Sequence, residues 1–133
     1  MTKYYKVVDS SIRDKFYSFN IDPTVTKEDE HCFGLSLEYS TEYWTKPVIE
    51  NSKLFVFDSL DSAISLVEYY GAQSIANIFE CEVKNPKRTK FIASTSFIST
   101  NTVVSFWNNH SNKLEAPHGT VVCDEVKLIK RVV

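Results

Sequence analysis

The chain has 133 residues, of which 43% are hydrophobic and 14% aromatic, and its formal net charge is −2. This length fits a single globular domain over residues 1–133, which buries enough surface to fold without a metal ion or a disulfide. The weak net charge excludes a surface built for bulk nucleic acid or an anionic membrane, and the apolar runs are too short to span a bilayer.

Apolar patterns and polar breaks alternate in the first third of the chain. The run KYYKVV over residues 3–8 predicts a strand that stops at the polar residues DSS. Beyond it, Ile12, Phe16 and Phe19 recur at helical spacing, which predicts a short N-terminal helix. Residues 20–30 are polar and charged, so we expect an exposed loop there.

Residues 31–39 show the period-2 pattern of a strand with one buried face. The apolar members of this pattern are Phe33, Leu35, Leu37 and Tyr39. Residues 41–52 carry aromatic side chains and a proline among polar residues, and we expect an ordered loop rather than a regular element.

The clearest pattern, over residues 53–83, predicts a strand, a helix and a second strand. KLFVF predicts the first strand, and an amphipathic helix follows over about residues 59–70. Asp58 or Ser59 can cap its first backbone amides, and Gly71 suits the left-handed position that ends a helix. The apolar stripe of the helix consists of Leu60, Ala63, Ile64 and Val67.

The second strand of this unit is predicted to be half buried. Phe79, Cys81 and Val83 lie on one face of it, and Glu80 and Glu82 lie on the other. A turn at NP ends the strand, within the one basic cluster of the chain, which consists of Lys84, Lys87, Arg88 and Lys90.

The last third of the chain has mainly β-type composition. Residues 91–97 and 102–107 predict strands, although the second segment does not alternate cleanly and a helix is the alternative. Residues 108–119 predict a polar loop. Residues 120–133 predict one long strand or two short ones, with inward positions at Val126, Leu128 and Val132.

These elements predict an α+β fold in a single domain. We expect a mostly antiparallel sheet, packed by one main helix at about residues 59–70 and by the short N-terminal helix. The strand-rich ends could pair through an edge strand into a homo-oligomer, although Lys127, Lys130 and Arg131 are the kind of residues that guard such an edge.

One enzyme class shares three short elements with this chain. Glu80 and Glu82 form a Glu-x-Glu pair, residues 94–96 form a Ser-Thr-Ser triplet, and Arg13 lies upstream. These elements resemble those of a class of ADP-ribosyltransferases, in which the triplet precedes the glutamate pair. Here the order is reversed and Arg13 is not on a first strand. We therefore carry over no catalytic residue, and a divergent ADP-ribosyltransferase-like enzyme is the third-ranked hypothesis.

The sequence contains no motif for metal binding, for thiol catalysis or for a phosphate-binding loop. The histidines are not spaced as metal ligands, and Gly34, Gly71 and Gly119 are too far apart to build a glycine-rich phosphate loop. The three cysteines include no CxxC pair, and no apolar signal sequence follows the first methionine. We expect structural thiols, no metal, no cofactor and a cytoplasmic location, in the host cell if the protein is viral.

Aromatic side chains in loops remain as the candidate binding site. Flat aromatic rings beside amide and cationic groups suit a stacked, nucleotide-like ligand whose phosphate meets a lysine or arginine. The same rings could anchor a protein partner, or the two tryptophans could simply cover the edge of the core. The candidate ligand-binding residues are Tyr43, Trp44, Lys46, Arg88, Lys90, Trp107, Asn109 and His110.

The succession YYKVV, YWTKP, LFVFDSLDSA, IFECEVKNP and GTVVCDEVKLI resembles small uncharacterised accessory proteins of bacteriophages and large DNA viruses. The resemblance covers most of the chain but rests on core strands and turns. It implies an α+β fold and a viral or prophage accessory role, and it transfers no site residue. Such proteins often act by binding, for example by sequestering nucleotide immune signals of the host.

The leading hypothesis is therefore a non-catalytic binding protein that takes a small nucleotide-like ligand in evasion of host defence. The alternative is a protein-interaction module that inhibits or adapts a host protein.

Overall fold

The structure is a computed structural model, which describes residues 3–19, 37–49, 51–93, 104, 106–108 and 113–133. Several sequence predictions fall outside these residues. They are the loop over 20–30, most of the strand over 31–39, the end of the strand over 91–97, and the site residues Asn109 and His110.

The fold is a mostly antiparallel sheet with few helical residues, which agrees with an α+β class. The main sheet runs in the order β10-β5-β1-β4-β9-β6, β2 pairs with β1 and with β3, and β7 pairs with β8 in a separate two-stranded sheet. The elements are β1 (Tyr4–Asp9), β2 (Phe16–Ser18), β3 (Glu38–Tyr39), β4 (Leu54–Phe57), α1 (Leu60–Tyr69), β5 (Ala76–Lys84), β6 (Lys87–Arg88), β7 (Phe91–Ala93), β8 (Lys113–Glu115), β9 (Thr120–Cys123) and β10 (Glu125–Arg131).

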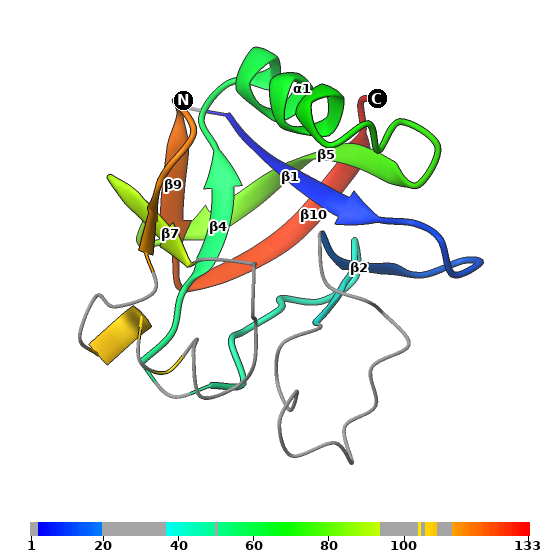
Figure 1. Ribbon diagram of the computed structural model, residues 1–133. Coiled ribbons are helices and arrows are strands. Elements are labelled where there is room, and N and C mark those ends of the chain that lie inside the picture. The colour runs from blue at the N-terminus through cyan, green and yellow to red at the C-terminus, as the bar shows by residue number, and fades with distance from the viewer. Residues whose placement is uncertain (1–2, 20–36, 50, 94–103, 105, 109–112) are drawn as a thin grey trace.

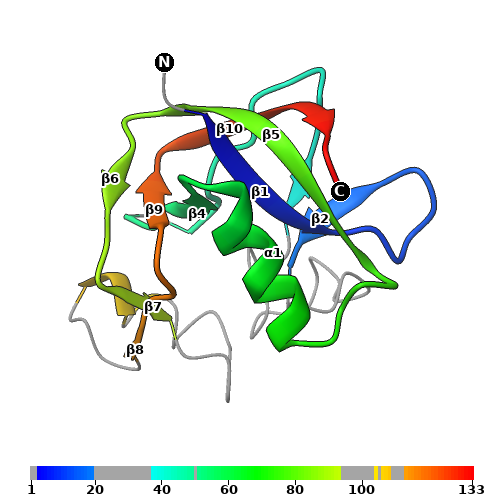
Figure 2. The same ribbon diagram turned by 90° about the horizontal axis from the view of Figure 1, so that it is seen from above.

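The main sheet closes on itself because β9 and β10 are one stretch of chain bent at Asp124. Strand β9 pairs with β4, strand β10 pairs with β5, and both β4 and β5 pair with β1. The amide of Asp124 donates to the carbonyl of Lys84 at 2.9 Å, which fixes the bend against the end of β5. In Figures 1 and 2, β9 lies on one side of the molecule and β10 runs from there to the other side.

Two apolar clusters occupy the two faces of this sheet. The inward face holds the larger cluster, formed by Val8, Tyr39, Leu54, Val56, Phe79, Cys81, Val121, Cys123, Val126 and Leu128. The outward face of β1, β4 and β5 carries the second cluster, which α1 covers in Figure 2. Its buried members are Val7, Phe57, Ala63, Val67, Ala72, Ala76 and Ile78. The inward positions predicted for Phe79, Cys81, Val126 and Leu128 are confirmed, and Val132 packs on the second cluster.

Helix α1 begins and ends at the residues that its sequence indicates. The Ser59 hydroxyl accepts a hydrogen bond from the amide of Ser62 at 3.2 Å, so Ser59 is the N-terminal cap. Gly71 follows the helix with a φ of 61°, in the left-handed region. These local signals lie within a few residues of the helix, which is why they predict its limits.

The predicted N-terminal helix is wrong. The chain turns at Asp14, which has a φ of 62°, and continues as strand β2. Ser18 of β2 lies opposite Val8 of β1, and the Phe16 ring packs on Phe79 with centroids 4.7 Å apart. Pairing with β1 therefore satisfies the backbone groups that a helix would have paired locally, and it still buries the apolar side chains.

Two further predictions in the last third need correction. Val104 and residues 106–108 are helical, so the preferred strand over residues 102–107 is wrong and the helical alternative holds for the described positions. Within the predicted loop over residues 108–119, Lys113–Glu115 form strand β8, which pairs with β7. Neither segment alternates cleanly between apolar and polar residues, and in the second of them pairing with β7 decided the strand.

Candidate functional site

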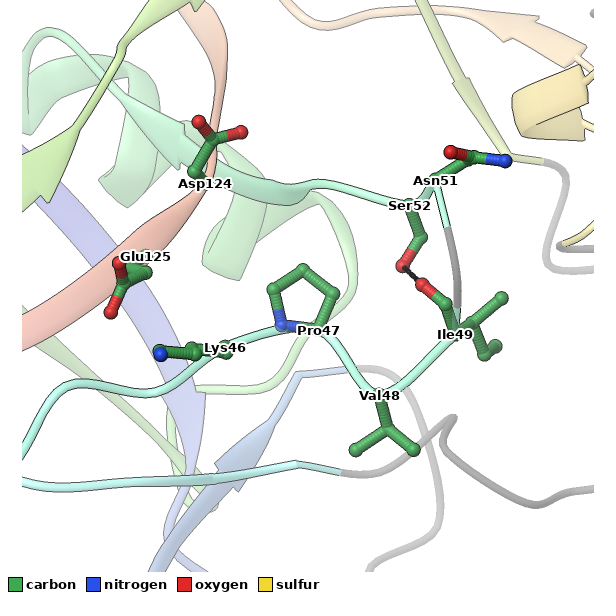
Figure 3. Close-up of a pocket in the computed structure, with 8 residues that line it drawn as sticks. All are labelled: Lys46, Pro47, Val48, Ile49, Asn51, Ser52, Asp124 and Glu125. Carbon is green, nitrogen blue, oxygen red and sulfur yellow. Dashed lines mark hydrogen bonds between the residues drawn. The ribbon is translucent and has the colours of Figure 1, made fainter.

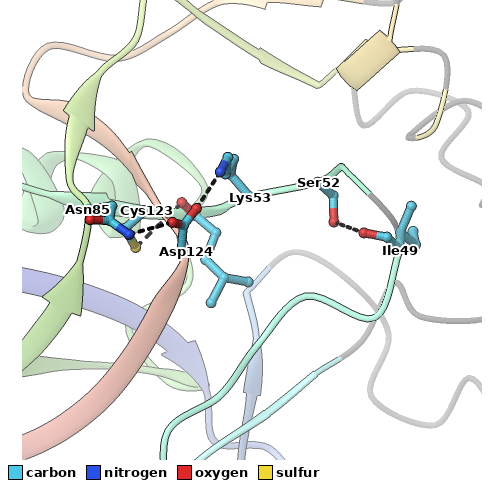
Figure 4. A network of polar contacts seen from close by, with 7 residues as sticks. Ile49, Ser52, Lys53, Asn85, Cys123 and Asp124 are labelled. Carbon is cyan, nitrogen blue, oxygen red and sulfur yellow. Dashed lines mark hydrogen bonds and ion pairs between the residues drawn. The ribbon is translucent and has the colours of Figure 1, made fainter.

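Charged and polar side chains from three segments meet at the bend between β9 and β10. Lys53, next to β4, forms an ion pair with Asp124 at the bend. The side-chain amide of Asn85, which follows β5, donates to the other Asp124 oxygen at 2.7 Å. These two hydrogen bonds, the one from Lys53 first, hold the pKa of Asp124 below its ordinary value. Figure 4 shows Asp124 between these two donors.

An open hollow of about 340 Å³ lies beside this bend. The Ser52 hydroxyl on its wall donates to the carbonyl of Ile49 at 2.6 Å, which closes the loop that precedes β4. In Figure 3, Asp124 and Glu125 lie on one side of the hollow and the Pro47 ring points towards it, whereas Val48 and Ile49 point away from the two acids. The lining residues are Lys46, Pro47, Val48, Ile49, Asn51, Ser52, Asp124 and Glu125.

Trp44 lies close to the same bend in the chain. The Lys84 ammonium lies 4.6 Å from the centre of the Trp44 ring and 3.3 Å from the carboxylate of Glu125. Backbone hydrogen bonds in both directions between Thr45 and Val126 hold this loop against β10. We call Trp44, Lys46, Lys53, Lys84 and Asp124 the corner site.

The structure brings only part of the predicted ligand site to this corner. Trp44 and Lys46 belong to the corner site, and Tyr43 is the neighbouring, exposed residue of the same loop. Trp107 stacks instead on Phe55 of β4, with centroids 5.5 Å apart and 25° between the rings. Its edge meets the buried Phe106 at 4.8 Å. Trp107 therefore packs against Phe55 and Phe106 and does not line the hollow.

Of the three predicted phosphate contacts, Lys46 lines the hollow, whereas Arg88 and Lys90 lie elsewhere. The Arg88 guanidinium forms an ion pair with Asp58 at 2.9 Å, which ties β6 to the segment before α1. Lys90 is exposed between β6 and β7, and its carbonyl accepts the amide of Ala116 at 2.9 Å. The sequence did not indicate Lys53 or Lys84 as site residues, because no local pattern shows that the bend at Asp124 will lie beside them.

The carboxylates of β5 belong to a charged ladder on the outside of the sheet. Glu80 forms an ion pair with Lys3 at 3.1 Å, and it lies opposite Lys130 of β10. Glu82 is exposed and lies opposite Lys127. Arg13 is fully exposed in the turn before β2, and residues 94–96 are outside the described chain. Opposite charges across two strands stabilise a sheet, so Glu80, with a side chain only 13% exposed, and the exposed Glu82 have a structural explanation.

The two described cysteines are poor nucleophiles. Cys81 and Cys123 are both buried in the inward-facing cluster. Burial raises the pKa of the Cys81 thiol to about 12 and that of Cys123 to about 11. A nucleophilic cysteine needs a lowered pKa, so neither thiol is suited to covalent catalysis.

The described part of the chain holds no group of three or more His, Cys, Asp or Glu side chains arranged for a metal ion. None of the helices described has the length and apolar character needed to cross a membrane. No protein-family model, no curated protein and no solved structure matches the chain.

Proposed function

We propose that the protein is a non-catalytic binding protein whose corner site takes a small nucleotide-like ligand. One observation carries the proposal: the Lys84 ammonium joins an indole ring, Trp44, to Glu125 on the wall of an open hollow that a second lysine, Lys46, also lines. A planar base can stack on an indole, and a phosphate can meet an ammonium group.

The charge distribution at the corner favours an anionic ligand. The anions at the hollow, Asp124 and Glu125, are already paired with Lys53 and Lys84. Lys46 is exposed, and the described part of the chain offers it no ion pair. A phosphate would therefore meet one unpaired ammonium and two more that can exchange partners, so binding should weaken as salt rises.

The biological role that we propose is sequestration. In a viral or prophage accessory protein, a site that binds a nucleotide signal of the host without altering it would lower the free concentration of that signal. The raised pKa values of the thiols and the ion pair of Glu80 with Lys3 fit a role without turnover.

Ligand-dependent thermal stabilisation tests the proposal. Mononucleotides and cyclic and linear dinucleotides and trinucleotides are added to the protein, and the melting temperature and the heat of binding are measured. We expect one class to raise the melting temperature of the parent protein and to lose that effect in Trp44→Ala and in Lys46→Glu. Lys90→Glu, which changes charge equally but away from the hollow, is the matched control and should bind as the parent does.

Three results would contradict the proposal. They are the absence of any shift with every nucleotide, unchanged binding in Trp44→Ala, and conversion of the bound nucleotide into a product seen by mass spectrometry. If a dinucleotide were turned over and Glu80→Gln abolished that turnover, the ADP-ribosyltransferase-like hypothesis would take its place.

A further inference from the structure

The solvent-facing stripe of α1 combines a highly exposed tyrosine with two carboxylates. Tyr69 has 83% of its surface exposed, the largest value among the exposed large hydrophobic residues. Asp61, Ser65, Glu68 and Tyr69 are all exposed and follow one another at positions i, i+4, i+7 and i+8. This spacing puts them on one side of the helix, opposite the buried Ala63 and Val67. We call these four residues the acidic tyrosine face.

Ring contacts connect this face to the body of the protein. The Tyr69 ring meets Tyr70 edge to face, with centroids 5.0 Å apart and 88° between the planes. Tyr70 meets Phe19 in the same manner at 5.8 Å and 70°. Phe19 in turn packs against the cluster under α1. Tyr69 is therefore the exposed end of a row of three rings that reaches the second cluster.

The electrostatic character of this face is negative. The two charged residues of α1 are both acids, and its last turn holds no basic residue. Neither Asp61 nor Glu68 forms an ion pair within the part of the chain described. The C-terminal end of the helix adds partial negative charge beside Tyr69. Nucleic acids and anionic membranes are repelled by such a face.

We infer that the acidic tyrosine face docks an arginine-bearing segment of a partner protein. A guanidinium can stack on the Tyr69 ring while it pairs with the Glu68 carboxylate, and a second cation can meet Asp61 about two turns away. Exposed tyrosines are frequent anchors of protein interfaces. The site is separate from the corner site, and it accounts for an exposed aromatic residue that the proposed ligand does not use.

Fluorescence polarisation with labelled peptides tests the inference. The probe is a twelve-residue peptide of alternating arginine and leucine, and the matched probe replaces each arginine with glutamate. We expect the arginine peptide to bind and the glutamate peptide not to bind. Tyr69→Ala and Glu68→Lys should each weaken binding by about tenfold or more, since one cation–π contact or one charge pair is worth about that factor. Tyr43→Ala, which removes another exposed tyrosine, should bind as the parent does.

Because Tyr69 is exposed, Tyr69→Ala should fold as the parent does, and circular dichroism of each variant checks this. The inference is overturned if the arginine peptide does not bind, if both peptides bind equally, or if Tyr69→Ala binds as the parent does. Sedimentation that shows dimers of the parent but monomers of Tyr69→Ala would assign the face to a second copy of the chain, and would overturn it as well. Nucleotide binding at the corner site is unaffected in each case, so the two proposals can fail separately.

Discussion

The ammonium group of Lys6 lies 4.7 Å from the centre of the Tyr39 ring, on the inward side of the closed sheet. Only 8% of Lys6 is exposed, and its ammonium donates to the carbonyl of Phe55 at 2.7 Å. A charged side chain thus takes a position that the pattern of β1 gives to an apolar residue, two residues before the fully buried Val8. An aromatic face and a carbonyl oxygen replace part of the water that a buried ammonium loses.

Reversing this charge should be strongly destabilising. Lys6→Glu would place a carboxylate against the negative ring face and the Phe55 carbonyl, and we expect it to lower the free energy of unfolding by about 3 kcal/mol or more. Urea unfolding followed by tryptophan fluorescence measures this loss. Lys15→Glu makes the same change at an exposed position, and its effect should stay within about 0.5 kcal/mol. Equal effects of the two changes would contradict a buried, partnered ammonium.

The two buried thiols should make the protein less stable in alkaline solution. Their pKa values of about 12 for Cys81 and about 11 for Cys123 lie above the ordinary value of 9.0. The folded protein therefore keeps protons that the unfolded chain releases between pH 9 and about pH 11. Their contribution to stability is complete below pH 9 and falls as pH rises, by up to about 1.4 kcal/mol per pH unit for each thiol.

Urea midpoints at several pH values between 8 and about 10.5 test this dependence. The double variant Cys81→Ala with Cys123→Ala should be less stable overall, because two small voids remain, but its stability should fall less steeply with pH. Lysines and tyrosines titrate in both proteins, so the difference in slope isolates the thiols. If stability fell equally with pH in the parent and in the double variant, the thiols would not contribute to the pH dependence.

The two tryptophans should differ in what they contribute to stability. Trp107→Ala removes the stack on Phe55 and the contact with Phe106, and we expect a loss of about 2–3 kcal/mol in the free energy of unfolding. Trp44→Ala removes a half-buried ring in a loop, and its cost should be about 1 kcal/mol. Chemical unfolding of the ligand-free variants measures both. A larger loss in the free energy of unfolding for Trp44→Ala than for Trp107→Ala would contradict the structural role that we give to Trp107.

The two left-handed glycines provide a matched pair of substitutions. A Cβ atom at Gly119 would lie 2.6 Å from the Ser62 hydroxyl and 3.0 Å from the Asp58 carboxylate, and the φ there is +84°. We expect Gly119→Ala to cost about 3 kcal/mol, from backbone strain and overpacking together. Gly71 has a φ of +61° but nothing within 4 Å of such an atom, so Gly71→Ala should cost only about 1 kcal/mol, from the backbone. Thermal unfolding separates the two values, and similar losses would rule out the close contact at Gly119.

The sequence by itself determined the strand, helix and strand over residues 53–83. The Ser59 cap, the helical stripe and Gly71 act over a few residues, and so does the alternation around Cys81. These signals are local in the chain, and they therefore predict local structure. The half-buried Trp107 also followed from the general tendency of large aromatics to be covered.

Only the tertiary structure decided which side chains meet. Lys53 and Asp124 are 71 positions apart, and Lys6 and Phe55 are 49 apart, yet the bend between β9 and β10 and the closure of the sheet bring each pair into contact. Pairing with the preceding strand β1 and with β3 made β2 a strand although Phe16 and Phe19 are spaced as in a helix. Backbone groups must find partners somewhere, and when the partner strand is distant in sequence no local pattern identifies it. The sequence therefore predicted Trp44 and Lys46 of the corner site, whereas Lys53, Lys84 and Asp124 join them only through the bend between β9 and β10.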